Sequence, residues 1–446
     1  MKNKILLVAA CLAAVLTSCG SEAEVESESV QTKKDTSVTS EGAVLDEVNS
    51  SDTASSDEST NDSEAETEEQ TKEIDPLEVS EDPADYTPEI KLYQIGSSHA
   101  GILSQNDELY LWGSEASGKL ANGNDYFMDY ECDPIKVMSD VASFSLGINN
   151  TEAVTNSGKL YMWGTNKHYE LGLGDIPDDN ISSPQFVMDN VKEVSCGAMH
   201  CGAVTLDGEL YVWGNNEHGE TGTENSTENT PVKIMDGVKT AVMGYEYSAA
   251  ITEDGSLYMW GSNSHGQLGD STTEDRSSPV KILDNVKKVD LGETHSAAIT
   301  ENGDLYVWGS NSASKLGLGV EDDMITVPTF LMANVKDVSL GVGFSAAVTE
   351  SGELYLWGSD SSGQQGDGNG RAFAATEQPT LLMENVDSVY ASSSGENASC
   401  VCFTNDGRMF AWGTNTWGQL GTGGTKDHYE PVEIVLSELF ENTLTV

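Results

Sequence analysis

The chain has 446 residues and carries 74 Asp and Glu against 22 Lys and Arg, a formal net charge of −52 at pH 7. Binding to nucleic acid needs basic side chains that neutralise phosphates, so this balance argues against a nucleic-acid partner and against attraction to an anionic lipid surface. It favours a soluble protein that repels acidic surfaces and attracts basic ones.

The first 18 residues are predicted to be a lipoprotein signal peptide. Lys2 and Lys4 give a positive start, and the apolar run over residues 5–16 is too short to span a bilayer. The run closes with the letters LTSC, which resemble a bacterial lipobox and imply cleavage before Cys19 and a diacylglyceryl group on its thiol. We expect a protein of the bacterial cell envelope, held to the membrane only through this lipid and exposed on the outer side. An ordinary secretory signal that contains a cysteine is the alternative.

Residues 19–88 are predicted to be a disordered acidic linker that follows the lipid anchor. Residues 20–88 contain 22 Asp and Glu, three Lys, and neither Trp nor Phe. Such a segment buries too little apolar surface to offset its chain entropy, so we expect a self-repelling spacer. A flexible chain of this length reaches about 45 Å on average. An acidic docking tail is the alternative.

Residues 89–446 contain one unit seven times. Its clearest stretch has the letters LYVWG at residues 305–309. Five close copies and one looser copy, at residues 409–413, occur elsewhere in the chain. The Trp residues of successive copies are separated by 47 to 55 residues, a period typical of propellers and solenoids. Seven of the eight Trp occupy this one position, so we predict that they form the core and do not bind sugars.

Each unit is predicted to contain four strands. In the most regular copy these are strand A over residues 279–283, strand B over 286–291, strand C over 296–300 and strand D over 305–308. The Asn302-Gly303 pair between strands C and D is a strong hairpin signal, because both residues tolerate positive φ. Strand D is apolar on both faces, which indicates sheets that are covered on both sides, as in stacked blades.

The two ends of the repeat region suggest a closed ring. The first copy begins at strand B, over residues 90–95, and the last copy ends with strand A, over residues 431–435, so every strand type occurs seven times. We predict an all-β fold, a seven-bladed β-propeller of four-stranded antiparallel blades. The ring is expected to close by pairing of the N-terminal strands B to D with the C-terminal strand A, which leaves no open edge.

The repeat resembles the regulator-of-chromosome-condensation repeat family. The letters GSNSHGQLG at residues 261–269, LGETHS at 291–296 and the LYxWG strand carry the resemblance, which spans about 350 residues and all seven units. It implies the seven-bladed fold and a non-enzymatic role as a binding platform. The founding members are nucleotide exchange factors for a small nuclear GTPase, and secreted bacterial relatives include propellers that inhibit β-lactamases through one face. A shared fold is only an analogy for function.

The candidate partner-binding face is the end of the ring that carries the B–C turns and the long, variable D–A loops. Variable loops on a rigid scaffold are the usual binding surface, and aromatic side chains in polar surroundings are typical of interface hot spots. Packing beneath the loops is the alternative for each aromatic residue. The candidates are Tyr126, Phe127, Tyr130, Tyr169, Tyr245, Tyr247, Phe344, Trp417 and Tyr429.

Histidine and cysteine residues are predicted to be structural. His99, His200 and His295 share one repeat position before strand C, about 50 residues apart, so they belong to different blades and cannot converge on one metal ion. Cys201, Cys400 and Cys402 are expected to be small, buried and reduced. A disulfide between Cys196 and Cys201, which lie on adjoining strands, is the alternative for that pair.

These observations favour a monomeric, non-enzymatic protein-binding module with an unidentified protein partner and no cofactor, metal or catalytic residue. Three alternatives remain open. They are an inhibitor of an extracellular enzyme, a guanine-nucleotide-exchange regulator by family analogy only, and a carbohydrate-active propeller.

Overall fold

The computed structural model describes residues 89–446 except residues 127, 371–374, 393–397 and 441–446. The predicted signal peptide, the lipid-attachment residue Cys19 and the predicted acidic linker lie outside the described residues. Every described residue belongs to one compact unit, within Leu77–Val446. Within these described ranges, no helix has the length and apolar character that a membrane crossing requires.

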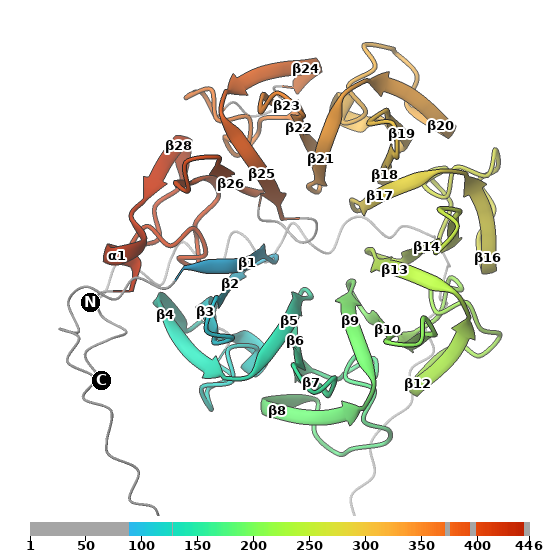
Figure 1. Ribbon diagram of the computed structural model, residues 1–446, viewed down its shortest axis with the longest axis vertical. Helices are drawn as coiled ribbons and strands as arrows, with labels where there is room; N and C mark the ends of the chain where they lie inside the picture. The colour runs from blue at the N-terminus through green and yellow to red at the C-terminus, as the bar shows by residue number, and fades with distance from the viewer. Residues whose placement is uncertain (1–88, 127, 371–374, 393–397, 441–446) are drawn as a thin grey trace, which may run out of the picture. The chain divides into compact units, whose positions relative to one another are not determined.

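Seven four-stranded antiparallel sheets surround a common axis, as the sequence predicts (Figure 1). We number them blade 1 to blade 7 in chain order. Strand B lies innermost in each blade, and strand C follows it. The innermost strands are β1 (Ile90–Ile95), β5 (Val141–Leu146), β9 (Val191–Cys196), β13 (Val238–Met243), β17 (Val286–Leu291), β21 (Val335–Leu340) and β25 (Val386–Ala391). The C strands are β2 (His99–Ser104), β6 (Asn150–Thr155), β10 (His200–Thr205), β14 (Tyr247–Thr252), β18 (His295–Thr300), β22 (Phe344–Thr349) and β26 (Ser399–Thr404).

Strand D comes third and strand A forms the outer rim. The D strands are β3 (Leu109–Ser114), β7 (Leu160–Thr165), β11 (Leu210–Asn215), β15 (Leu257–Gly261), β19 (Leu305–Ser310), β23 (Leu354–Ser359) and β27 (Met409–Gly413). The A strands are β4 (Tyr130–Met138), β8 (Asn180–Met188), β12 (Thr227–Met235), β16 (Arg276–Leu283), β20 (Met324–Met332), β24 (Ala375–Met383) and β28 (His428–Ile434). Two short 3-10 turns, Ala116–Gly118 and Ser312–Ser314, and the helix α1 (Leu436–Leu439) complete the described elements.

The ring closes differently from the prediction. Strand A pairs with the strand D that precedes it, so β4 completes blade 1 and β28 completes blade 7, and the first and last described strands share no blade. The long D–A loop turns the chain back within one sheet, whereas the short A–B turn delivers it to the inner strand of the next blade. Blades 1 and 7 therefore close the ring by packing, with the Tyr93 ring 5.5 Å from that of Tyr390 and 5.6 Å from that of Phe403.

The repeat Trp residues join each blade to its neighbour. Each indole Nε1 donates a hydrogen bond to a backbone carbonyl in the D–A loop of the preceding blade, and all seven side chains are fully buried. The prediction that they form the core is confirmed. The donor and acceptor pairs are Trp163–Lys119, Trp213–Glu170, Trp260–Glu220, Trp308–Gln267, Trp357–Lys315, Trp412–Gln364 and, across the closure, Trp112–Gln419, at 2.7 to 3.1 Å.

The glycine that ends the loop letters QLG is required by this contact. Gly269 has a φ of 74°, and a Cβ atom built on it would lie 2.8 Å from Nε1 of Trp308. A larger residue would therefore be strained in its backbone and would collide with the indole.

The cysteine pattern is partly as predicted. Cys400 and Cys402 are free and buried, which confirms the expectation for these two. Cys201 is bonded to Cys196, so the expectation that it is reduced is wrong and the alternative disulfide holds. The reason is the register of β9 and β10, which places the two residues directly opposite each other with Cα atoms 4.2 Å apart.

We expect the Trp112→Phe and Trp412→Phe substitutions to lower the free energy of unfolding by about 1–3 kcal/mol each, because each removes the indole donor from a buried carbonyl, that of Gln419 or Gln364. Urea unfolding followed by circular dichroism measures the loss. The Tyr355→Phe substitution, on a neighbouring D strand but without an indole bond, is the control and should change stability much less. Unchanged stability in both Trp variants would show that the indole bonds do not hold the blades together.

Candidate binding face

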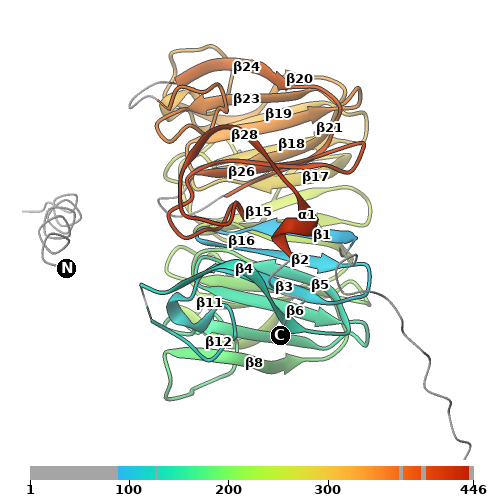
Figure 2. The same cartoon turned by 90° about the vertical axis from the view of Figure 1, so that its left-hand side faces the viewer.

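One end of the ring carries all the B–C turns and D–A loops, and we call it the loop face. Antiparallel strands that run B, C, D, A place these connections together, while the C–D and A–B turns lie at the opposite end. Figure 2 shows the ring from its edge, with strands running between the two ends. The D–A loops are the longest connections, over residues 115–129, 166–179, 216–226, 262–275, 311–323, 360–374 and 414–427.

A conserved local bond pattern within the repeats gives the D–A loops a defined shape. In blade 4, the Asn263 side-chain oxygen accepts the Leu268 N–H at 3.0 Å, and its amide nitrogen donates to the Glu274 carbonyl at 3.1 Å. Asn166, Asn216, Asn311 and Asn415 accept the corresponding N–H in four other loops, and Asp360 does so in blade 6. These six loops, those of blades 2 to 7, therefore present a preformed surface.

Three of the nine predicted aromatic residues are exposed on this face. Tyr126 is 67 % exposed, Tyr130 46 % and Tyr429 43 %. Tyr126 and Tyr130 belong to blade 1, which neighbours blade 7 at the ring closure (Figure 1). Tyr429 belongs to blade 7 but lies on its other side, against Gly363 and Gly370 in the D–A loop of blade 6. The prediction missed Met128, which is 67 % exposed in the same blade 1 loop, because it considered only aromatic side chains.

Three further candidates, Tyr169, Tyr245 and Trp417, are half-buried on the loop face. Trp417 lies at the closing seam, where its neighbour Gly418 packs against Cys132 of blade 1. Phe127 lies outside the described residues. The half-buried set therefore offers part of each ring to a partner and packs the rest against the loops.

Tyr247 and Phe344 do not belong to the face, because both are fully buried. Each is the first residue of a C strand, and this position points into the neighbouring blade. The Tyr247 hydroxyl donates to the carbonyl oxygens of Gly292 at 3.0 Å and His295 at 2.7 Å in blade 5. The prediction that these two rings lie on the binding face is wrong, because it relied only on their closeness to the B–C turns in the sequence.

The first position of strand C also holds three histidines, and its location explains why they are buried. His99, His200 and His295 are buried, and their Nε2 atoms lie 2.8 to 3.1 Å from the hydroxyls of Thr151, Ser248 and Ser345 on the next blade. The structural role predicted for them is confirmed. Burial lowers the pKa of all three, to about 3 for His200, so they are neutral hydrogen-bonding groups at neutral pH.

The loop face is strongly acidic. Among the described residues, the seven D–A loops contain 19 Asp and Glu and four Lys. Two of the four lysines, Lys119 and Lys315, are buried, with exposed fractions of 1 % and 3 %. The lysines that the described loops expose to solvent are therefore Lys167 and Lys426. The face thus attracts basic surfaces and repels acidic ones.

The buried lysines are satisfied by neighbouring turns. Lys119 Nζ donates to the Ser98 hydroxyl at 2.6 Å and lies 3.3 Å from the Ile148 carbonyl and the Asn149 side-chain oxygen. Lys315 Nζ donates to the Thr294 hydroxyl at 2.6 Å. Burial lowers the pKa of Lys119 to about 7 and that of Lys315 to about 8. Both occupy the repeat position that holds Gln267, Gln364 and Gln419 in other blades.

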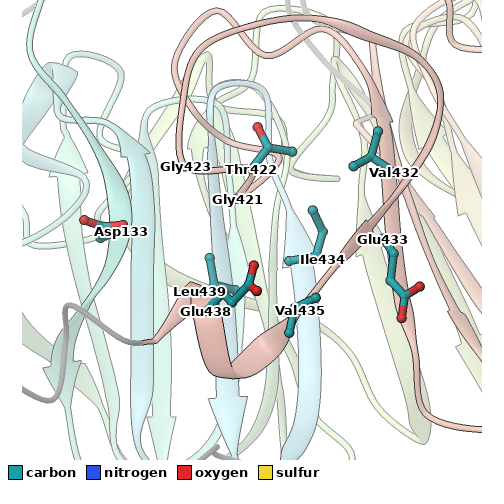
Figure 3. Close-up of a pocket in the computed structure, with 10 residues that line it drawn as sticks. All are labelled: Asp133, Gly421, Thr422, Gly423, Val432, Glu433, Ile434, Val435, Glu438 and Leu439. Carbon is teal, nitrogen blue, oxygen red and sulfur yellow. The ribbon is translucent and has the colours of Figure 1, made fainter.

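The described surface has hollows at the seam of blades 7 and 1 and on the loop face. One of about 200 Å³ lies at the seam of blades 7 and 1, between β28, α1 and β4 (Figure 3). Its charged side chains are all carboxylates, Asp133, Glu433 and Glu438. A wider hollow on the loop face surrounds His218, whose Nδ1 lies 3.1 Å from Asp275, and the bond to Asp275 raises the pKa of this imidazole.

We expect the Lys119→Gln substitution to flatten the rise of stability with pH. The folded-state pKa is about 7 and the unfolded value is 10.5, so the unfolded chain binds more protons in this window and stability increases with pH. The linkage contributes about 2 kcal/mol between pH 7 and 9, which the variant should lose. Urea unfolding at both pH values measures it. Exposed Lys167→Gln is the control, and an equal slope in both variants would contradict the burial of this charge.

Comparison with known proteins gives one family. Residues 37–344 match the model of the RCC1-like domain, and residues 335–364 and 406–443 match models of the regulator of chromosome condensation (RCC1) repeat.

Individual relatives match over short stretches. Ras guanine nucleotide exchange factor C of Dictyostelium discoideum is 29 % identical over 123 residues, which cover 20 % of this chain and 8 % of that protein. The mitochondrial RCC1 domain-containing protein RUG3 of Arabidopsis thaliana is 32 % identical over 112 residues, 24 % of each chain. The chain thus spans a quarter or less of the length of these relatives.

Solved structures show the same fold. Human WBSCR16 superposes with a TM-score of 0.65 at 22 % identity, over 74 % of this chain and 95 % of that one. Prp20p of Saccharomyces cerevisiae superposes with a TM-score of 0.59 at 24 % identity, over 68 % and 80 %. At these identities the likeness concerns the fold alone.

Proposed function

Because the chain belongs to the RCC1-like domain family, we propose that it is a non-enzymatic protein-binding module whose loop face holds a basic surface of another protein. The observation that carries this proposal is the combination, on one preformed face, of exposed large side chains with 19 acidic residues and two accessible lysines among the described D–A loops.

Exposed large side chains of blades 1 and 7 on the loop face would supply the anchors. Tyr126, Met128 and Tyr130 of blade 1 and Tyr429 of blade 7 present large side chains that keep much of their surface in solvent. Tyr in particular combines an apolar ring with a polar hydroxyl at low entropy cost, and such residues dominate interface energies. Burial of these side chains against a partner would provide most of the affinity.

The acidic loops would select the partner and steer it. Exposed carboxylates such as Asp178 and Asp179 of blade 2 and Asp322 of blade 5 add negative charge to the same face. Charges at the rim of an interface raise the association rate more than they change the dissociation rate, and their effect weakens with salt. A partner with clustered Lys and Arg is therefore expected.

Proteins of similar fold support the ligand class and not its identity. The structural study of Prp20p concerns its binding to Gsp1p and histones, and yeast RCC1 has been solved with Kap60 bound. The likeness to Ras guanine nucleotide exchange factor C covers too little of that protein to carry an exchange activity to this chain.

We further propose that a lipid on Cys19 anchors the protein and that residues 20–88 separate the propeller from the membrane on the outer side of the cell. Two acyl chains on one residue suffice for stable anchoring. The acidic composition of the intervening segment would keep it away from anionic lipid headgroups.

The face is tested with the full chain carrying Tyr126→Ala, Tyr130→Ala and Tyr429→Ala. The unaltered chain should capture a basic protein from envelope extracts and culture medium, and the dissociation constant measured with that purified protein should rise at least tenfold in the triple variant, since three anchors are lost. The matched control is Leu206→Ala, which removes a 64 % exposed side chain from the opposite end of the ring. Equal affinity of both variants would place binding elsewhere.

A second arm tests the role of charge. Asp178→Lys together with Asp322→Lys should slow association severalfold and reduce its dependence on salt, with little change in dissociation. Association rates that are independent of both salt and these substitutions would contradict recognition of a basic surface.

The anchor is tested with Cys19→Ser. Mass spectrometry of the unaltered protein should show a mature N-terminus at Cys19 that carries a diacylglyceryl group, and the protein should stay with the membrane fraction. The variant should lack the lipid and appear in the soluble or secreted fraction. Membrane association that survives the substitution, or an N-terminus at another residue, would contradict this anchor.

A further inference from the structure

One blade interface departs from the pattern that the repeat sets. The third residue of strand C is small or apolar in six blades, but in blade 2 it is Glu152, a fully buried residue of β6. Isolated carboxylates are costly to bury, and the other copies show that this fold accommodates an apolar residue there. The six equivalents are Gly101, Gly202, Ala249, Ala297, Ala346 and Val401.

A second unusual residue, in blade 3, faces Glu152. The last residue of strand B is apolar in six blades and is Cys196 in blade 3. Between blades 3 and 4 this pair of positions holds Gly202 and Met243, which are in close contact. Between blades 2 and 3 the same two positions hold the carboxylate of Glu152 and the sulfur of Cys196, so the two exceptions coincide in space.

A third residue completes the cluster. Cys201 lies opposite Cys196 in the register of β9 and β10 and is joined to it by the disulfide. The two sulfur atoms and a carboxylate oxygen of Glu152 all lie within 4.8 Å of one another, and all three residues are buried.

The oxygen atoms of this cluster lack partners. The structure gives neither carboxylate oxygen of Glu152 a donor at hydrogen-bond distance and angle. The side-chain oxygen of Asn150 is also without a partner, although its amide nitrogen lies 3.4 Å from the Cys201 sulfur. These buried acceptor atoms are not committed to protein donors, so they remain available to a ligand once the sulfur atoms are reduced.

We propose that reduction of the Cys196–Cys201 disulfide turns this cluster into a zinc site, with the two cysteine sulfurs and a Glu152 carboxylate oxygen as ligands. A thiol or phosphine reductant supplies two electrons, and with two protons the S–S bond becomes two thiols. Binding of Zn²⁺ then releases both thiol protons to solvent. Two thiolates and a carboxylate form a donor set that zinc accepts, and thiolates favour zinc over calcium or magnesium.

A water molecule would provide the fourth ligand of a tetrahedral site. The two states would hold the ring differently. The disulfide joins β9 to β10 within blade 3, whereas a metal bound to Glu152 as well would also tie blade 2 to blade 3. Zinc would therefore replace a bond within one blade by a bond across two blades.

The test uses the full chain with Cys11→Ser and Cys19→Ser, which removes the thiols outside the described residues. The chain is reduced with a phosphine, freed of reductant without air, and titrated with Zn²⁺ or Co²⁺. We expect one metal per chain after reduction and none before it, a thiolate-to-cobalt charge-transfer absorption, and a rise in melting temperature that grows with metal concentration.

Each substitution introduces the residue that the same repeat position holds in another blade, so the fold should tolerate it. Cys196→Leu with Cys201→Ser reproduces residues 291 and 296 and should abolish binding, and Glu152→Ala reproduces residue 297 and should weaken it at least tenfold. Cys400→Ser with Cys402→Ala removes the other buried thiols and should leave binding intact. The proposal is overturned if the reduced chain binds no metal, if the Cys196 and Cys201 variant binds as well, or if Glu152→Ala keeps full affinity.

Discussion

The bond from each repeat indole to a carbonyl of the preceding blade is the interaction on which the other features depend. It satisfies a buried donor and acceptor, fixes the distance between adjacent blades, and fastens the middle of every D–A loop to the ring. The seventh copy, from Trp112 to Gln419, is the one that joins the last blade to the first. Because the loops of the candidate binding face are attached to the core in this way, the face owes its rigidity to the same residues that hold the blades together.

Periodicity made most of the fold predictable. The Trp spacing, the Asn-Gly and Asp-Gly turns and the apolar D strands indicated seven blades of four strands, and the structure has them. The closure was predicted wrongly because counting strand types cannot distinguish a strand A that pairs with the preceding strand D from one that pairs with the following strand B. Both arrangements contain each strand seven times. The length of the D–A loop decides between them, since it allows the chain to return within one sheet.

The candidate face was predictable in its location but not residue by residue. Tyr126, Tyr130 and Tyr429 lie on loops or rim strands and are exposed, whereas Tyr247 and Phe344 occupy the repeat position of the buried histidines. Alignment of the copies, which already indicated a structural role for His200 and His295, would have moved the two rings into the interior. The sequence could not decide whether Cys196 and Cys201 form a disulfide, for a different reason. Strand register, which a sequence pattern gives only approximately, decides whether two cysteines lie opposite each other.

A repeat protein carries several versions of each local environment, so a departure from the pattern can be judged against the residues that the same fold accepts elsewhere. Lys119 and Lys315 depart from a position that holds glutamine in three blades, and hydrogen bonds from neighbouring turns satisfy both. Glu152 departs from a position that holds small or apolar residues, and nothing in hydrogen-bond geometry satisfies it. The first departure has a structural account in the described residues. The second has no such account, and two sulfur atoms lie opposite its carboxylate. This is why the proposed metal site of the reduced chain is placed at this interface and not at the more conspicuous acidic loops.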